Sequence, residues 1–314
     1  MTKRFFLMPM CGCTQRHRIL DMNQISRKSQ SPLHSVTPLH LEESPSMALL
    51  LAKASVKTGQ YKLGDTLPPL TALWENLKID KNHLQKYNRL CGFESNQMPA
   101  TYLWIRAFPL IMSILVSKQF PMRAMGQVHL RNQISVHSVL DMNKPFSITA
   151  AVDHSELSSK GLEWSMQISA MSDNHVVWSS RSTFLYRCKT NIERSSKPLN
   201  KPQGEAQNWQ LPSDLGRRYA PISGDYNPIH LSALSAKLFG FKKAIAHGMW
   251  SKARCLAAMD SFIPKVDYSV DVNFLKPVFL PSKVNFYSGL SDSQRQFSLF
   301  NASGDQMHLQ GSIS

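Results

Sequence analysis

Residues 218–259 read RYAPISGDYNPIHLSALSAKLFGFKKAIAHGMWSKARCLAAM. An acid, Asp225, and an imidazole, His230, lie five positions apart in this stretch, on either side of Pro228. Pro228 fixes its own φ angle, and Gly224 permits a tight bend just before the acid. We therefore expect both side chains on a stiffened, non-helical loop, where an acid and a base can handle one water molecule.

A second polar cluster, Ala-His-Gly-Met at residues 246–249, precedes an apolar helical pattern. Gly248 would place a bare backbone N–H at the positive end of that helix, where it can stabilise a developing negative charge. The structural alternative is that Asp-x-Asn-Pro is common turn and capping chemistry and that a lone histidine after it is a surface or core residue. Each cluster by itself favours this alternative.

The two clusters belong to one longer spaced pattern. Its members are Tyr219-Ala220, Ser223-Gly224-Asp225, Asn227-Pro228, His230, Gly240-Phe241 and Ala246-His247-Gly248-Met249. This pattern strongly resembles the signature of the MaoC-like dehydratases, also called R-specific enoyl-thioester hydratases or type 2 hydratases. The resemblance is densest over about forty residues.

The resemblance implies a hydro-lyase. Asp225 and His230 would hold one water that adds to a trans-2-enoyl thioester, giving the (R)-3-hydroxyacyl thioester, and the reverse reaction would be dehydration. Asn227 would orient the pair by hydrogen bonding. The N–H of Gly248 would donate to the thioester oxygen. No cofactor and no metal are expected.

Other residues near the pattern support weaker expectations. Ser223 is expected to cap the loop, and His247 to shape the helix start rather than act as an acid. Lys242 and Lys243 could contact phosphates of a substrate carrier or form an ordinary solvated surface pair, and these alternatives are evenly balanced. We group Ser223, Asn227, His247, Lys242 and Lys243 as candidate substrate-binding residues.

The composition is that of a folded, basic protein. Charged residues make up 18%, hydrophobic ones 42%, and the net charge is +15. This charge suggests an anionic partner, which coenzyme A, an acyl carrier protein, nucleic acid or a membrane surface would satisfy. No nucleic-acid-binding motif is present, so nucleic acid is a minority interpretation. The family resemblance implies an acyl-CoA or acyl carrier protein thioester as the substrate, and both carriers are anionic. Two alternatives stay open: a non-catalytic acyl-thioester binding protein on the same fold, and a basic nucleic-acid or membrane-surface protein.

Five cysteines do not make a disulfide framework, and a reducing cytoplasm is the expected setting. The apolar run at residues 99–116 is interrupted by Arg106 and Pro109, which argues for a buried helix and against an integral membrane segment.

The same unit occurs twice in the chain. Gly92-Phe93 pairs with Gly240-Phe241, and Pro99-Ala100 pairs with His247-Gly248, at one constant offset. Alternating apolar and polar segments follow each predicted helix, as in antiparallel meanders. The repeat and the family resemblance together predict an α+β double hot dog, in which two long central helices are each wrapped by a curved antiparallel sheet.

We expect four segments: a flexible tail at 1–46, a degenerate N-terminal hot-dog repeat at 47–188, a linker at 189–212, and the catalytic repeat at 213–314. The first repeat lacks Asp-x-Asn-Pro-x-His and is not expected to be catalytic. Pairing into a homodimer of double hot dogs stays open.

Overall fold

The computed structural model describes residues 38–41, 43, 45–193, 206–291 and 294–314. The chain divides into Met1–Ser35, which lies outside the described residues, and Val36–Ser314, which carries every element below. The predicted tail at 1–46 lies largely outside the described residues.

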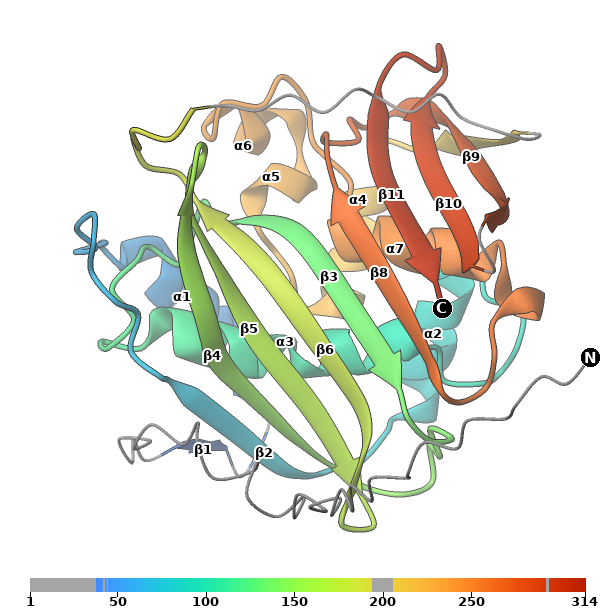
Figure 1. Ribbon diagram of the computed structural model, residues 1–314, viewed down its shortest axis with the longest axis horizontal. Coiled ribbons are helices and arrows are strands. Elements are labelled where there is room, and N and C mark those ends of the chain that lie inside the picture. The colour runs from blue at the N-terminus through green and yellow to red at the C-terminus, as the bar shows by residue number, and fades with distance from the viewer. Residues whose placement is uncertain (1–37, 42, 44, 194–205, 292–293) are drawn as a thin grey trace, which may run out of the picture. The chain divides into compact units, whose positions relative to one another are not determined.

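One sheet of eleven strands forms the framework (Figure 1). Its spatial order is β1-β2-β4-β5-β6-β3-β8-β11-β10-β9-β7, and every pairing is antiparallel except that of β1 with β2. The strands are β1 (Leu39–Leu41), β2 (Thr71–Leu77), β3 (Val128–Val136), β4 (Phe146–Ser158), β5 (Gly161–Ser172), β6 (His175–Tyr186), β7 (Gln207–Leu211), β8 (Tyr268–Phe274), β9 (Ser282–Ser291), β10 (Gln294–Asn301) and β11 (Met307–Ile313).

The strand order repeats. In the first half the order is β2-β4-β5-β6-β3, and in the second half it is β7-β9-β10-β11-β8, so each half places its second strand last. These two last strands, β3 and β8, pair with each other along the seam from Arg131–Asn273 to Val136–Tyr268. The repeat predicted from the sequence is confirmed, and the chain is a double hot dog.

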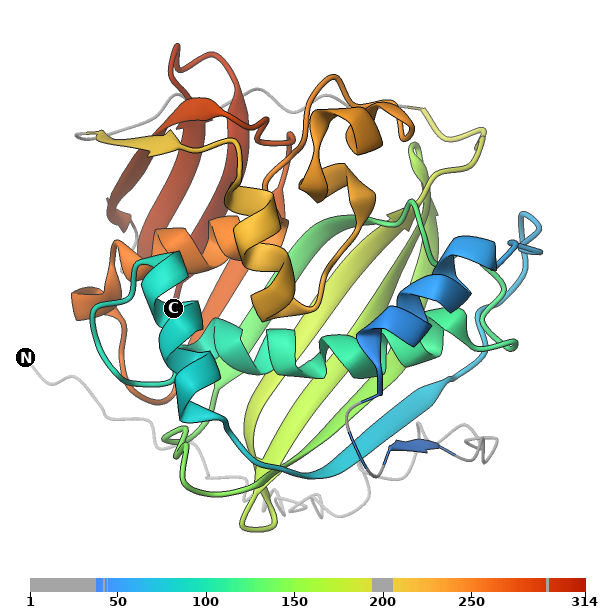
Figure 2. The same cartoon turned by 180° about the vertical axis from the view of Figure 1, so that it is seen from behind.

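Helices cover one face of the sheet (Figure 2). They are α1 (Met47–Val56), α2 (Lys81–Cys91), α3 (Ala100–Val116), α4 (Leu215–Ser223), α5 (Pro228–Leu231), α6 (Ala233–Lys237) and α7 (Gly248–Ala257), with a 3₁₀ turn η2 (Asp260–Phe262). The long helix α3 is buried along nearly its whole length and contains Pro109, as predicted. Among the described residues, none of the helices combines the length and the apolarity needed to cross a bilayer.

The two halves differ in one connection. Helices α2 and α4 both follow the first strand of their half, and both end at a left-handed glycine, Gly92 (φ 86°) and Gly224 (φ 75°). Seven residues then separate Gly92 from Ala100, whereas 23 separate Gly224 from Gly248. The pairing of Pro99-Ala100 with His247-Gly248 therefore holds, but the structural counterpart of Gly92 is Gly224 and not Gly240. The second half carries an insertion, and α5 and α6 lie within it.

Strand β7 lies inside the predicted linker at 189–212 and pairs with β9. Likewise, β1 lies inside the predicted tail and pairs with β2. These short segments belong to the sheet because their backbone groups are used in its ladder. Residues 194–205 lie outside the described residues, and the predicted domain boundaries stay predictions.

A buried polar network joins helix α7 to the seam. Lys252 is fully buried, and its ammonium donates to the carbonyl oxygen of Asn132 (2.8 Å), to the Asn132 side-chain oxygen (2.7 Å) and to the carbonyl of Val270 (3.1 Å). The Asn132 amide donates onward to Ser182 Oγ, which also accepts from the indole of Trp104 on α3. Both central helices are thus fixed to the same point of the sheet.

Candidate functional site

The site begins where α4 ends. Gly224 adopts the left-handed conformation that a side chain disfavours, and this turns the chain out of the helix. Ser223 Oγ accepts from the N–H of Asp225 at 3.2 Å and donates to the carbonyl of Tyr219 at 3.1 Å. Ser223 thus links the last turn of α4 to the backbone of Asp225, and its assignment as a capping or substrate-binding residue stays a prediction.

Asp225 and Asn227 shape the next turn. The N–H of Asn227 donates to Asp225 Oδ1 at 3.1 Å, and Asn227 Oδ1 accepts from the N–H of Ile229 at 3.4 Å. Asn227 is therefore the N-cap of α5, and Pro228 occupies its first turn, where a missing N–H costs nothing. The prediction of a non-helical loop is wrong for His230, because this residue lies on the one-turn helix α5.

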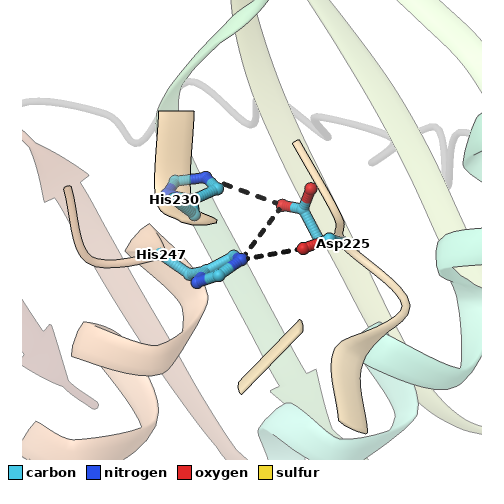
Figure 3. Close-up of side chains that lie close together, drawn as sticks. All are labelled: Asp225, His230 and His247. Atoms are coloured by element: carbon cyan, nitrogen blue, oxygen red, sulfur yellow. Dashed lines mark hydrogen bonds and ion pairs between the residues drawn. The ribbon is translucent and has the colours of Figure 1, made fainter. Parts of the chain in front are cut away.

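His230 is buried, and a hydrogen bond to a backbone carbonyl fixes its imidazole. Its Nδ1–H donates to the carbonyl of Ile245 at 2.8 Å, and because a carbonyl only accepts, Nε2 keeps its lone pair. That Nε2 lies 3.8 Å from Asp225 Oδ2 (Figure 3). Gly216 on α4 permits this arrangement, since a Cβ at Gly216 would overlap the carbonyl oxygen of His230.

His247 completes the cluster. Its Nε2–H donates to the carbonyl of Asp225 at 2.9 Å, and the same nitrogen lies 4.0 Å from Asp225 Oδ2 (Figure 3). The imidazole stacks on that of His230, with ring centroids 3.7 Å apart, and it also packs against the ring of Tyr219. His247 stands at the N-cap position of α7, but its side chain caps nothing there. It fixes the Asp225 backbone instead.

Both imidazoles are expected to be neutral near pH 7. Burial lowers the pKa of His230, while the Asp225 carboxylate and the Ile245 carbonyl partly oppose this effect. The pKa of His247 lies well below its ordinary value because of burial and the neighbouring His230. Asp225 is more open, with 24% of its side chain exposed.

Gly248 is the first residue of α7, so its N–H has no acceptor inside the helix. A Cβ at Gly248 would lie 3.2 Å from the ring of Phe274 on β8. The aromatic ring thus occupies the space that a side chain would need. Of the other predicted residues, Lys242 and Lys243 are exposed on the segment before α7 and are not part of the histidine–aspartate cluster.

Asp225, His230 and His247 are also a candidate set of metal ligands, because one ligand atom from each lies within 4.8 Å of the others. Tetrahedral zinc, however, requires ligand atoms about 3.4 Å apart, given bonds of ~2.1 Å. The separations of 3.8 Å and 4.0 Å are wider, and His247 Nε2 carries the proton that it donates to the Asp225 carbonyl. The absence of a metal and of a cofactor stays a prediction.

Sequence reasoning missed three supports of the site: the Ile245 carbonyl, Gly216 and Phe274. A backbone carbonyl carries no residue-type signal. Gly216 reads as an ordinary helix glycine, and Phe274 reads as one apolar residue of a strand. Their importance comes from tertiary contacts alone.

Comparison with known proteins places these features in a family. Residues 194–307 match the model of the MaoC like domain. The chain is 32% identical over 255 residues to the 3-hydroxyacyl-thioester dehydratase X of Mycobacterium tuberculosis, a match that spans 79% of this chain and 90% of that protein.

Two solved structures are similar to this chain. The crystal structure of HtdX from Mycobacterium tuberculosis has a TM-score of 0.68 and 29% identity, over 77% of this chain and 98% of that one. A MaoC-like dehydratase from Phytophthora capsici has a TM-score of 0.62 over 81% of this chain and 97% of that one; at 16% identity this likeness concerns the fold.

Proposed function

The chain belongs to the MaoC-like dehydratase family, and on that premise we propose that it reversibly hydrates a trans-2-enoyl thioester to the (R)-3-hydroxyacyl thioester. The Mycobacterium tuberculosis relative is named a 3-hydroxyacyl-thioester dehydratase. The reaction is a step of fatty acyl metabolism, and its direction in the cell depends on which thioester is supplied.

One observation carries the proposal: the unprotonated His230 Nε2 faces Asp225 Oδ2 across 3.8 Å. This gap is too wide for a direct hydrogen bond, yet a water molecule beside it can reach both atoms at about 2.8 Å. Asp225 orients that water by accepting one of its hydrogens, and His230 accepts the other. The pair therefore suits an attack by water on an electrophilic carbon.

His230 acts twice in the proposed hydration step. The water oxygen bonds to C3 of the enoyl group while its proton passes to His230 Nε2, and the C2–C3 π electrons move toward the thioester oxygen. His230 then returns the proton to C2, so one water supplies both the hydroxyl and the hydrogen. Addition from the side of Asp225 and His230 gives one stereoisomer.

The backbone N–H of Gly248 would stabilise the negative charge that develops on the thioester oxygen. This N–H at the start of α7 would donate to the thioester oxygen as negative charge develops there, a contribution typically worth about 3–4 kcal/mol. The partial positive charge of the helix N-terminus acts in the same direction. The ring of Phe274 lies beside Gly248.

The carrier of the acyl group is coenzyme A or an acyl carrier protein. Both are anionic, and the sequence has no acid between Asp225 and Asp260. Lys237, Lys242 and Lys243 in that segment are exposed and would meet phosphates or acidic side chains. We also place the enzyme in the cytoplasm, because Cys91 and Cys255 are buried free thiols, and we leave its assembly into a dimer as a proposal.

The test follows loss of the conjugated enoyl-thioester absorbance with trans-2-enoyl-CoA substrates. Asp225→Asn and His230→Ala should each lower kcat at least about a hundredfold. The matched control is His154→Ala, since His154 is an exposed histidine on β4 and should have no effect. If the wild type binds enoyl-CoA and enoyl carrier protein but hydrates neither, the chain is a binding protein and the proposal is wrong.

A further inference from the structure

His129 lies at a β-bulge in the non-catalytic half. In the pairing of β3 with β6 the register shifts between His129 and Arg131, so Leu130 is the extra residue. Side chains alternate along a strand, and counting from the buried Asn132 would turn His129 to the outer face. The bulge turns it to the helix-covered face instead, as bulges beside active sites often do.

The imidazole of His129 lies among aromatic rings. Its centroid is 5.5 Å from that of Trp104, 4.8 Å from that of Phe184 and 5.0 Å from that of Phe274. Its Nε2 is sealed from solvent and has no hydrogen-bond partner among the described residues. Burial and the charge of Lys252 lower the pKa of His129 to about 3, so the ring is neutral at physiological pH.

This ring adjoins the active site. Phe274, which contacts it, also fills the space beside Gly248. The Asp225 carboxylate is near enough to raise the pKa of His129. Phe274 therefore connects the ring of His129 to the Gly248 end of the candidate site.

We propose that His129 determines substrate specificity: its Nε2 accepts a hydrogen bond from a hydroxyl group carried on the acyl chain beyond C3. The ring proton is on Nδ1, which donates to the Arg131 backbone, so the neutral ring offers Nε2 as an acceptor only. The inference rests on the proposed function for the placement of the thioester. A buried nitrogen without a partner is unfavourable, and a polar group that reaches it removes that penalty. A plain hydrocarbon chain leaves the nitrogen unpaired, so the site discriminates against it.

The test measures binding of saturated thioesters, which cannot be hydrated. Hexanoyl-CoA, 5-oxohexanoyl-CoA and 6-hydroxyhexanoyl-CoA are titrated calorimetrically into the wild type and into His129→Phe. 6-Hydroxyhexanoyl-CoA should bind the wild type about tenfold more tightly than hexanoyl-CoA and 5-oxohexanoyl-CoA do, because only its hydroxyl can donate to Nε2. In His129→Phe, which keeps a ring in the stack, that preference should vanish while hexanoyl-CoA binds no more weakly.

Phe184→Leu is the matched control, because it loosens the stack and leaves Nε2 in place; it should affect all three thioesters alike. Equal or absent binding of the three by the wild type, or a preference retained in His129→Phe, overturns the inference. Failure of the hydratase proposal is separate: the wild type would then discriminate among these thioesters but leave enoyl-CoA unchanged.

Discussion

The imidazole rings of His230 and His247 are stacked, with centroids 3.7 Å apart and 25° between their planes. Two protonated rings at this distance would repel each other strongly, and both are buried. His247 already donates to the Asp225 carbonyl, whereas His230 presents a free Nε2 to the Asp225 carboxylate. The two histidines therefore differ in their contacts: His247 holds the backbone of Asp225, and His230 keeps a nitrogen that can accept a proton.

The pH dependence of hydration follows from this arrangement. His230 must be neutral to accept a proton, and burial lowers its pKa below the ordinary 6.5. As the pH falls through that lowered pKa, kcat/KM should fall tenfold per pH unit; above it, this group causes no change. Initial rates from pH 4.5 to 8 would show it, with circular dichroism confirming that the protein is folded. An acid limb at or above pH 6.5 would contradict the assignment.

His247→Phe separates the two histidines. Phenylalanine keeps a ring stacked on His230 but loses the hydrogen bond to the Asp225 carbonyl. We expect kcat to fall about tenfold or more, because the acid is no longer held in place. The acid limb should not move, since burial, Asp225 and the Ile245 carbonyl set the pKa of His230. A shifted limb with unchanged kcat would show that His247 acts by tuning that pKa.

Gly248→Ala tests the start of α7. The new Cβ would lie 3.2 Å from Phe274, so the ring or the helix start must move by a few tenths of an ångström. We expect kcat/KM to fall about tenfold, while the free energy of unfolding changes by less than about 1 kcal/mol. Gly289→Ala is the control, because a Cβ at Gly289 meets nothing within 4 Å. Equal values of kcat/KM for the two variants would show that Gly248 has no part in the mechanism.

Gly216→Ala should lower stability and activity more than Gly248→Ala does. Its Cβ would overlap the carbonyl oxygen of His230, and neither backbone can yield without moving α4 or α5. We expect a loss of about 2–4 kcal/mol of stability together with most of the activity. Thermal and urea unfolding would measure the first, and the enoyl-CoA assay the second.

Lys252→Met tests the network at the seam. The variant leaves two oxygens of Asn132 and the carbonyl of Val270 without their donor. Removing a buried charge offsets part of this loss, and we expect a net destabilisation of about 2–4 kcal/mol in urea unfolding. Lys283→Met, at an exposed position on β9, should change stability by less than about 0.5 kcal/mol. A more stable Lys252→Met protein would show that burial of the charge dominates.

Much of the fold could be predicted from sequence because its signals are local. Alternating patterns mark the strands, and the apolar run before Val116 marks α3. The repeat was visible because both central helices follow a similar segment. Gly92 was paired with the wrong glycine because nothing in the sequence marks the segment before Gly248 as an insertion. A single constant offset between the two halves therefore aligned Gly92 with Gly240.

Part of the geometry of the candidate site also follows from the sequence. Asp225 and His230 are close in sequence, so turn chemistry alone brings them near each other. The contact between His247 and Asp225 spans 22 positions and depends on how α7 packs. His129 could not be found from the sequence, since its inward direction results from a bulge that leaves no pattern in the residue types.

The seam between β3 and β8 joins two different sequences by the pairing that two identical subunits would otherwise make. In a symmetric pair of identical chains, every substitution appears twice, and a change that improves one site must be tolerated at its twin. Here each half accumulates mutations independently. A side chain such as His129, which lies among the aromatic rings of the first half, can therefore change without any change at the corresponding position of the second half.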